Sequence, residues 1–266
     1  MHTLRVYRAL AGAALRTEAQ YRANLGLWIL GGVAYQGVGF AFIWVVIRQF
    51  GTLAGWPLGE IAFLYGMRLA AHAIFAVPFG ELFGIDYIIR EGRFDRYLIR
   101  PVNPFIQVIT GRLRLQTLGD VAGGFTLLAV AARLVPVAWT PASIAYLIAA
   151  LLGGALIEAG LQTIISALAF RMLSVTSLRI FTDNILTTFG GYPLSILPAA
   201  ARFGLTFIIP HAFIAYFPAT ILLGRSHQLA VPAALAAAAP ATGAVLFTAA
   251  LWLWHRQINR YTSSGH

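Results

Sequence analysis

Four ionisable residues stand inside otherwise apolar stretches of this chain: Arg68, Asp120, Glu158 and Asp183. A charged side chain is costly in hydrocarbon, so each of these groups should face protein or water. Such groups can pair, line a polar path across a membrane, or carry a coupling proton along it. They can equally serve as structural pairs between helices. The residue types alone leave both roles open.

Glu158 lies deepest within its apolar stretch, and three glycines are close to it in the sequence: Gly153, Gly154 and Gly160. Small residues let two helix backbones approach closely inside a membrane. This neighbourhood favours a position for Glu158 at a buried helix interface.

Catalytic motifs are missing from the sequence. It has no His-Glu-x-x-His, no nucleophile elbow and no carboxylates paired at a usable spacing. His72, His211 and Ser166 are the residue types of an intramembrane serine protease, but no local motif brings them together. Cysteine is absent, which excludes disulfides, thiolate metal sites and a cysteine nucleophile. We therefore expect no catalytic residue and no metal site in this chain.

The basic residues also exclude one kind of nucleotide site. All 19 are arginines, and the chain has no lysine. A P-loop requires a lysine that reaches the nucleotide phosphates. We therefore expect no cofactor in this chain; if ATP drives its work, a partner chain must hold the ATP and magnesium.

Composition sets the class of the elements that position these residues. The chain is 59% hydrophobic with a mean hydropathy of +0.76, far above a soluble domain. Its net charge of +10 is better explained by arginines at an anionic lipid surface than by nucleic acid. The sequence therefore predicts an all-helical, polytopic membrane protein with a single domain over residues 1–266 and no nucleic-acid partner.

Seven apolar stretches follow an arginine-bearing N-terminal segment. They cover Leu25–Ile47, Glu60–Gly80, Leu115–Ala132, Ala142–Phe170, Leu178–Leu197, Phe203–Gly224 and Gln228–Trp254. Residues 1–24 have arginines on one helical arc, which suits a helix in the membrane interface, although an ordinary cytoplasmic tail is the alternative. Prolines interrupt the sixth stretch, so we expect residues 198–226 to re-enter from the outer face without crossing. Six transmembrane helices remain.

The distribution of arginines predicts the orientation of these six helices. With the N-terminus in the cytoplasm, fourteen arginines fall inside and four outside, and Arg68 lies within a span. Cytoplasmic loops of membrane proteins carry such an excess. We therefore expect a multi-pass protein of the cell inner (plasma) membrane, with both termini cytoplasmic.

The loop over residues 81–104 then lies in the cytoplasm and is unusually rich in arginine. Gly92 can end an incoming helix in a left-handed conformation. From Arg93 to Arg100 the spacing predicts a short helix, with Phe94, Tyr97 and Leu98 on one face and arginines on the other. Pro101 should stop this helix. Its guanidinium groups would meet either lipid phosphates or an acidic protein partner.

Two stretches resemble a known family. "EGRFDRYLIRPVNPF" is similar to the cytoplasmic loop of ABC-2 type transporter permeases, in which Gly-x-Phe-Asp-x-x-Leu-x-Arg-Pro-x-Asn-Pro recurs. "YPLSILPAAARFGLTFIIPHAFIAYFPATILLG" also resembles that family in the placement of its Tyr-Pro, Ile-Pro and Phe-Pro pairs. His211 departs from the small apolar residue expected there. The resemblance covers nearly the whole chain.

The resemblance implies a permease subunit of an ATP-binding cassette exporter that works by alternating access. Its partners would be a dimer of cytoplasmic ATPase subunits and a second permease, identical or related, in a lipid membrane. The loop would carry a coupling helix seated on the ATPase, and the re-entrant helices would form an outer gate. The implied ATPase interface comprises Glu91, Gly92, Arg93, Phe94, Asp95, Arg96, Arg100 and Pro101. The alternative from another class is a stand-alone secondary transporter or channel that uses the intramembrane carboxylates.

Overall fold

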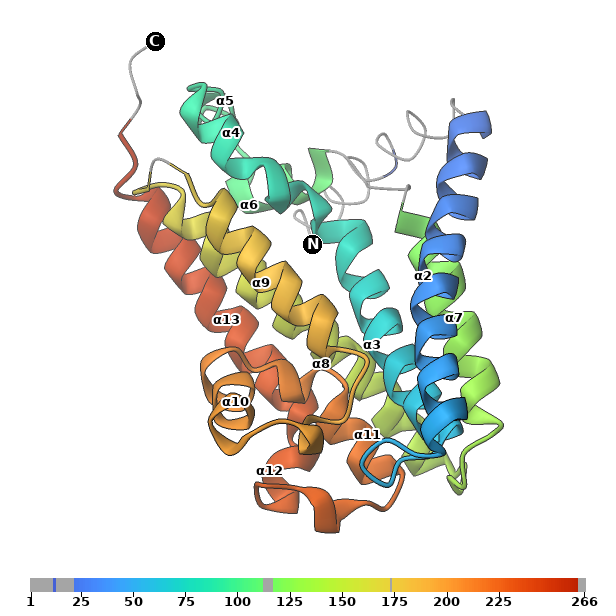
Figure 1. The fold of residues 1–266 in the computed structure, drawn as a ribbon. Helices are drawn as coiled ribbons and strands as arrows, with labels where there is room; N and C mark the ends of the chain where they lie inside the picture. The colour runs from blue at the N-terminus through green and yellow to red at the C-terminus, as the bar shows by residue number, and fades with distance from the viewer. Residues whose placement is uncertain (1–11, 13–21, 112–116, 173, 263–266) are drawn as a thin grey trace.

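The chain folds into a bundle of helices whose loops gather at its two ends (Figure 1). This computed structural model describes residues 12, 22–111, 117–172 and 174–262. Within these residues every regular element is helical, and the single extended contact is a bridge between Leu53 and Trp56. The interfacial helix predicted for residues 1–24 falls almost entirely outside the described residues.

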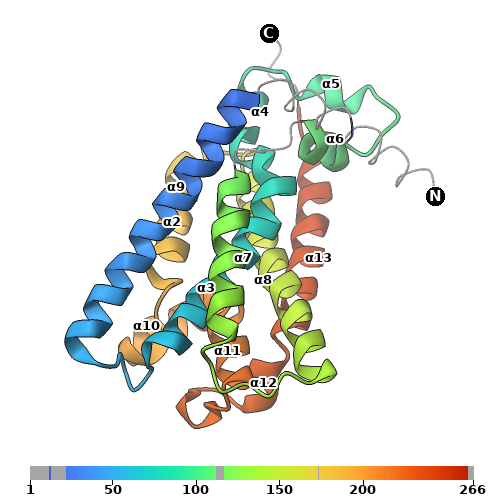
Figure 2. The same cartoon turned by 90° about the vertical axis from the view of Figure 1, so that its right-hand side faces the viewer.

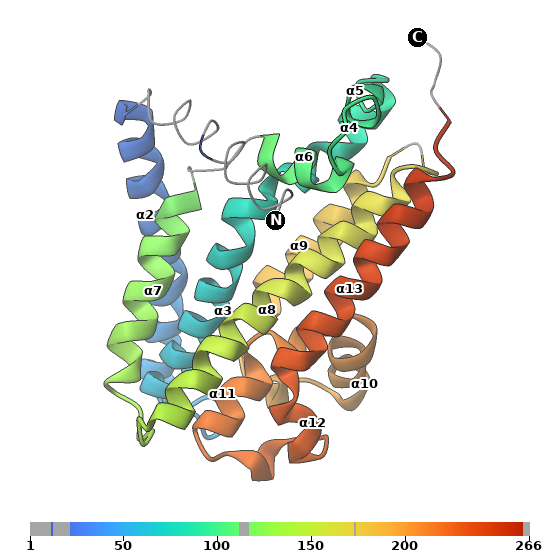
Figure 3. The same ribbon diagram turned by 180° about the vertical axis from the view of Figure 1, so that it is seen from behind.

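The longer helices of the described residues run alternately between the two ends. They are α2 (Arg22–Phe50), α3 (Leu58–Phe79), α7 (Leu118–Ala132), α8 (Pro141–Leu168), α9 (Thr176–Phe189) and α13 (Ala239–Ile258). The chain direction, followed through the three ribbon views, reverses at each step of this series (Figures 1, 2 and 3). This alternation is the arrangement that successive membrane crossings produce.

Two helical segments of the described chain are long and apolar enough to span a membrane, Leu58–Arg90 and Pro141–Leu168. A bent pair, Ala199–Ile208 with His211–Leu222, raises the number to three if it counts as one span. Gly26–Ala41 and Leu118–Ala132 are shorter apolar helices. These findings confirm an all-helical membrane protein, and the number of six crossings stays a prediction.

One predicted span is shorter than expected. The apolar stretch Leu178–Leu197 becomes α9, which ends at Phe189. Fourteen helical residues reach only about 21 Å, less than the roughly 30 Å of hydrocarbon. The reason is local, because Gly190, Gly191 and Pro193 follow and are poor helix formers.

Close backbone contact joins α8 to α13. A Cβ atom added at Gly243 would lie 2.1 Å from the carbonyl oxygen of Gly153, and one at Gly153 would lie 2.5 Å from the Cα of Pro240. Only residues without a side chain permit this approach. Gly153 therefore serves the close approach of helices predicted for it.

The lower end in Figure 1 is built from short helices: α10 (Ala199–Phe203), η4 (Gly204–Ile208), η5 (His211–Phe213), α11 (Tyr216–Leu222), η6 (Ser226–Gln228) and α12 (Ala233–Ala237). Before them lies η3 (Leu194–Ile196). The chain bends by 75° between Ile208 and His211, where Pro210 interrupts the helix. Both arms of the bend thus remain at the same end of the bundle.

The upper end carries the loop after α3. The helix continues through η1 (Gly80–Gly84) into α4 (Ile85–Arg90), and the chain then forms α5 (Asp95–Leu98) and α6 (Pro104–Gly111). The C-terminal end of α13 lies at this same end (Figures 1 and 3). α3, η1 and α4 thus form one nearly continuous helical path into the loop.

Candidate functional site

A buried ion pair joins the two helices that run through the centre of the bundle. Arg68 Nη1 of α3 lies 2.9 Å from Glu158 Oε1 of α8, and the two side chains are 7% and 1% exposed. The second oxygen of Glu158 lies 2.7 Å from Nδ1 of His72, one turn along α3 from Arg68. Each charge thus has a partner of opposite sign or a hydrogen-bonding group, as burial requires.

The Arg68 guanidinium also contacts α9. Its Nε donates to the carbonyl of Leu186 at 3.4 Å. A Cβ atom added at Gly190 would lie 2.8 Å from Arg68 Cγ, so the glycine makes room for the arginine stem. His211 is buried near this group. One arginine therefore connects α3, α8 and α9.

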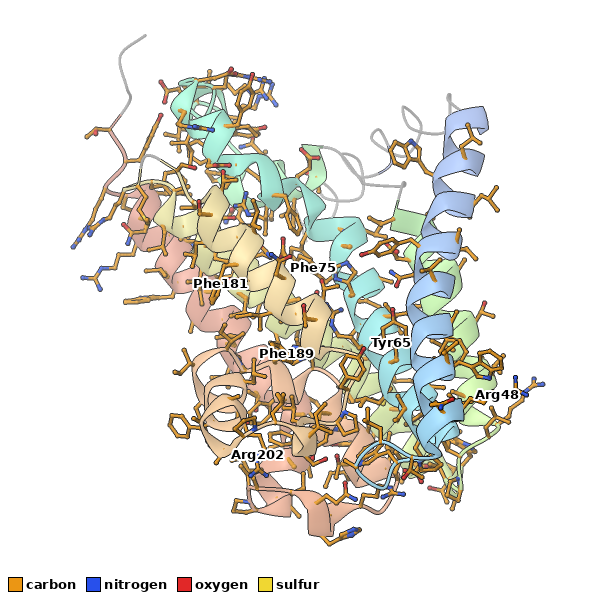
Figure 4. The ribbon with its side chains drawn as sticks, viewed as in Figure 1. Arg48, Tyr65, Phe75, Phe181, Phe189 and Arg202 are labelled. Atoms are coloured by element: carbon orange, nitrogen blue, oxygen red, sulfur yellow. The ribbon has the colours of Figure 1, made fainter. Side chains whose placement is uncertain are left out.

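Asp120 has a different partner. Gln36 of α2 donates to Asp120 Oδ1 of α7 at 2.7 Å, and the Tyr65 hydroxyl of α3 donates to Gln36 Oε1 at 3.2 Å. Tyr65 lies beside α2 in Figure 4. These contacts form a hydrogen-bonded chain across α7, α2 and α3.

Asp183 is likewise held by an amide. Gln162 Nε2 of α8 donates to Asp183 Oδ1 of α9 at 2.6 Å. The structure thus brings Arg68 and Glu158 into direct contact, and it gives Asp120 and Asp183 one glutamine each. All four ionisable residues that the sequence places inside apolar stretches make polar contacts between helices.

A metal site has no support in the described residues, where no group of three or more His, Asp and Glu side chains converges. The polar contacts at the centre join neighbouring helices, two or three at a time. What they can do chemically is hold those helices in register inside an apolar medium.

The loop at the upper end turns sharply at Gly92. Its φ is +66°, a conformation that glycine adopts without strain. The Arg93 amide donates to the Ile88 carbonyl and the Gly92 amide donates to the Ile89 carbonyl, both at 3.0 Å. These two bonds form a Schellman motif, and they confirm the helix end predicted at Gly92.

The helix after this turn is shorter than predicted. It covers only Asp95–Leu98, whereas the spacing predicted a helix from Arg93 to Arg100. Leu98 is exposed and Ile99 is 83% exposed, although Leu98 was expected on the face of Phe94 and Tyr97. The residues exposed at the tip are Glu91, Arg93, Arg96, Leu98, Ile99, Arg100 and Pro101, with Asp95 half-buried.

An aromatic cluster fixes the tip to the rest of the bundle. We call it the aromatic anchor, and its members are Phe94, Phe105, Phe170, Trp254 and Tyr261. The Phe94 ring is fully buried, and its centroid lies 4.9 Å from that of Phe170 in an edge-on arrangement. Trp254 stacks edge-on against Phe105 at 5.4 Å. Edge-to-face geometry at these distances is the favourable one for aromatic rings.

Polar contacts complete the attachment of the loop. Gln107 donates to the carbonyls of Tyr97 and Val102 at 2.8 and 2.7 Å. A hydrogen bond from the Tyr87 hydroxyl holds the pKa of the Glu91 carboxyl below its usual value, so Glu91 stays charged near neutral pH. The tip is therefore attached to the bundle and exposes arginines together with Leu98 and Ile99.

Comparison with known protein families matches residues 33–265, most of the chain, to the family described as ABC-2 family transporter protein. The chain belongs to the ABC-2 family of transporter proteins. Searches of curated proteins and of solved structures each returned no match. The family confirms the resemblance seen in the two sequence stretches. An ABC-2 protein is a multi-pass membrane transport component rather than an enzyme, and such proteins normally work with an ATP-binding subunit.

Several polar residues of this ABC-2 protein carry little signal in the sequence. Gln36 and Gln162 are uncharged, and only their position inside apolar stretches could have singled them out as partners for carboxylates. His72 was considered only for protease chemistry, although it lies one turn from Arg68. Leu98 was expected on the face of Phe94 and Tyr97, and no pattern singled out Ile99, because only the fold exposes these two side chains.

Proposed function

We propose that this chain is the permease subunit of an ATP-driven exporter that works by alternating access. It crosses the cell inner membrane six times with both termini in the cytoplasm. It pairs with a second permease, identical or related, and with a dimer of cytoplasmic ATPase subunits that hold the ATP and magnesium. Membership of the ABC-2 family supports the transport role and the kind of partner.

The observation that carries this proposal is the construction of the tip at residues 91–101. A loop that merely rested on lipid would need only its arginines. Here the exposed Leu98 and Ile99 stand in the chain between the exposed Arg96 and Arg100. Phe94 is buried in the aromatic anchor. Exposed apolar side chains together with arginines are typical of a protein interface. In this proposal Phe94 supports the interface from behind and does not contact the partner.

The alternation of the long helices supports six crossings. If the tip is cytoplasmic, the C-terminal end of α13 is cytoplasmic too, because both lie at one end of the bundle (Figures 1 and 3). The bent pair around Pro210 then lies at the outer end, where a re-entrant gate is expected. Irregular backbone at membrane depth is tolerated where protein covers it, and His211 and Phe213 are buried.

The proposed mechanism follows from the continuity of the chain. ATP binding closes the ATPase dimer and draws the docked tips of the two permeases together. Because α3 leads through η1 and α4 into the tip, this movement tilts α3. The Arg68–Glu158 pair ties α3 to α8, so both helices respond. The transport path then closes toward the inner side of the membrane and opens toward the outer side.

A double charge reversal tests the docking. Asp95→Arg with Arg96→Asp keeps the net charge of the loop, so attraction to lipid should hardly change. A docked interface would instead meet like charges or lose partners, which costs about 2–5 kcal/mol where the charges are desolvated. We expect the variant to insert normally but to lose the co-purifying ATPase, or to hydrolyse ATP without transport.

The matched control is Asp95→Glu with Arg96→Lys, which keeps the order of charges. Transport and ATPase rates are measured side by side in reconstituted vesicles. Unchanged coupling of ATP hydrolysis to transport in the reversed variant would instead indicate that the tip is a basic loop in contact with lipid headgroups. Transport by the purified chain without any ATPase would favour the stand-alone transporter instead.

A further inference from the structure

A second buried ion pair connects the loop to α9. Asp86 lies near the start of α4, and its Oδ1 is 3.5 Å from Nη1 of Arg179. The Thr176 hydroxyl donates to the other carboxylate oxygen at 3.0 Å. Arg179 also donates to the carbonyl of Phe83 and lies over the Phe83 ring at 5.7 Å. The side chains of Asp86 and Arg179 are 7% and 6% exposed.

This contact differs from the general packing of the bundle. Along α9, polar contacts recur every three or four residues: Thr176 and Arg179 to Asp86, Asp183 to Gln162, and the Leu186 carbonyl to Arg68. Large apolar side chains of α9 are exposed on its other side, among them Ile180 and Phe181 (Figure 4). Directional polar bonds thus hold α9 to the bundle beside the apolar packing of Ile185, Leu186 and Phe189.

Burial makes the joint between α4 and α9 stiff. Separating two buried charges leaves each uncompensated in an apolar medium, which is strongly unfavourable. A displacement of α4 must therefore carry the N-terminal end of α9 with it, whereas apolar side chains alone would let the two slide. The C-terminal end of α9 is held differently, by a hydrogen bond from Arg68 to the Leu186 carbonyl.

We propose that Asp86 and Arg179 are positioning residues that transmit movement of the docked tip to α9. The inference rests on the proposed function, because it needs an ATPase that moves the tip. It adds a second route into the membrane beside the continuous path through α3. The pair acts through α4 and α9 and touches neither nucleotide nor cargo.

The test uses the complex of the tagged full chain with its co-purifying ATPase, reconstituted in vesicles. The chain has no cysteine, so Asn184→Cys on the exposed side of α9 can be labelled alone by a maleimide. In this background we expect the labelling rate to differ with and without Mg-ATP. Asp86→Asn should reduce that difference at least about fivefold, the lower end of common coupling effects. ATP hydrolysis should continue.

Two controls separate transmission from general damage. Asp86→Glu retains the carboxylate and should keep the response. Arg90→Gln removes an exposed group 3.9 Å from the same carboxylate and should also keep it. If Asp86→Asn does not assemble, Thr176→Val removes a single hydrogen bond to Asp86 and should reduce the response in part.

The outcomes distinguish the two proposals. A full nucleotide response in Asp86→Asn, or in Thr176→Val where that variant is used, overturns the transmission role and leaves the proposed function intact. The transmission role is overturned as well if the labelling rate of the parent complex is the same with and without Mg-ATP. If no ATPase co-purifies with the parent chain, the proposed function fails and this inference fails with it.

Discussion

Arg68 and Glu158, ninety residues apart in the chain, form an ion pair of 2.9 Å between α3 and α8 with both side chains buried. The other carboxylate oxygen of Glu158 lies 2.7 Å from His72 Nδ1. The Arg68 guanidinium also donates a hydrogen bond to the Leu186 carbonyl of α9. A single pair thus connects three helices. Removal of this pair should therefore lower the stability of the helix bundle.

Glu158→Leu should destabilise the protein by about 3–5 kcal/mol, because it leaves the Arg68 charge buried without a partner. Glu158→Gln keeps the shape and some hydrogen bonding, so it should cost less, about 1–3 kcal/mol. Thermal unfolding of the purified protein in detergent measures both. The double variant Arg68→Met with Glu158→Leu should recover part of the loss. Equal stability of Glu158→Leu and the parent would show that the pair holds nothing together.

Gly243→Ala should disturb the packing of α8 on α13, since its Cβ would lie 2.1 Å from the Gly153 carbonyl oxygen. Overpacking of this kind costs about 1–3 kcal/mol. Gly31→Ala is the matched control, because a Cβ there meets nothing within 4 Å and should gain up to about 1 kcal/mol in an exposed helix. Equal unfolding temperatures of the two variants would argue against the close contact.

Phe94→Ala and Ile99→Ala should separate support of the tip from contact with a partner. Phe94 is fully buried in the aromatic anchor, so its loss should cost about 3–5 kcal/mol of stability and loosen the tip. Ile99 is 83% exposed, so its truncation should leave unfolding unchanged and weaken ATPase co-purification. Binding that survives Ile99→Ala unaltered would remove Ile99 from the interface.

Single cysteines should report the topology. Ala200→Cys, exposed in α10, should react with a membrane-impermeant maleimide from outside intact cells. Ile99→Cys should react only after the membrane is opened. Ser264→Cys, at a position outside the described residues, should behave like Ile99→Cys if the C-terminus is cytoplasmic. Outside labelling at Ser264 would instead require an odd number of crossings.

The sequence by itself determined the all-helical membrane class, the family, and the position of the arginine-rich tip along the chain. These are local or additive properties: hydropathy sums over a window, Gly92 ends a helix through its own φ, and the family motifs are contiguous. Most helix positions followed for the same reason. The end of α9 at Phe189 could not be predicted from hydropathy, because the apolar stretch continues past Gly190 while helix propensity falls there.

Only the tertiary structure decided which polar residues meet. Arg68 could have paired with Asp120 or Asp183, but helix packing places Glu158 against it and supplies Gln36 and Gln162 for the two aspartates. The Asp86–Arg179 pair likewise joins residues more than ninety positions apart. Such partners depend on how helices cross, and no local pattern encodes a crossing. The burial of Phe94 and the exposure of Ile99 arose in the same way, because rings from the ends of α8 and α13 cover one side of the tip and leave the other open.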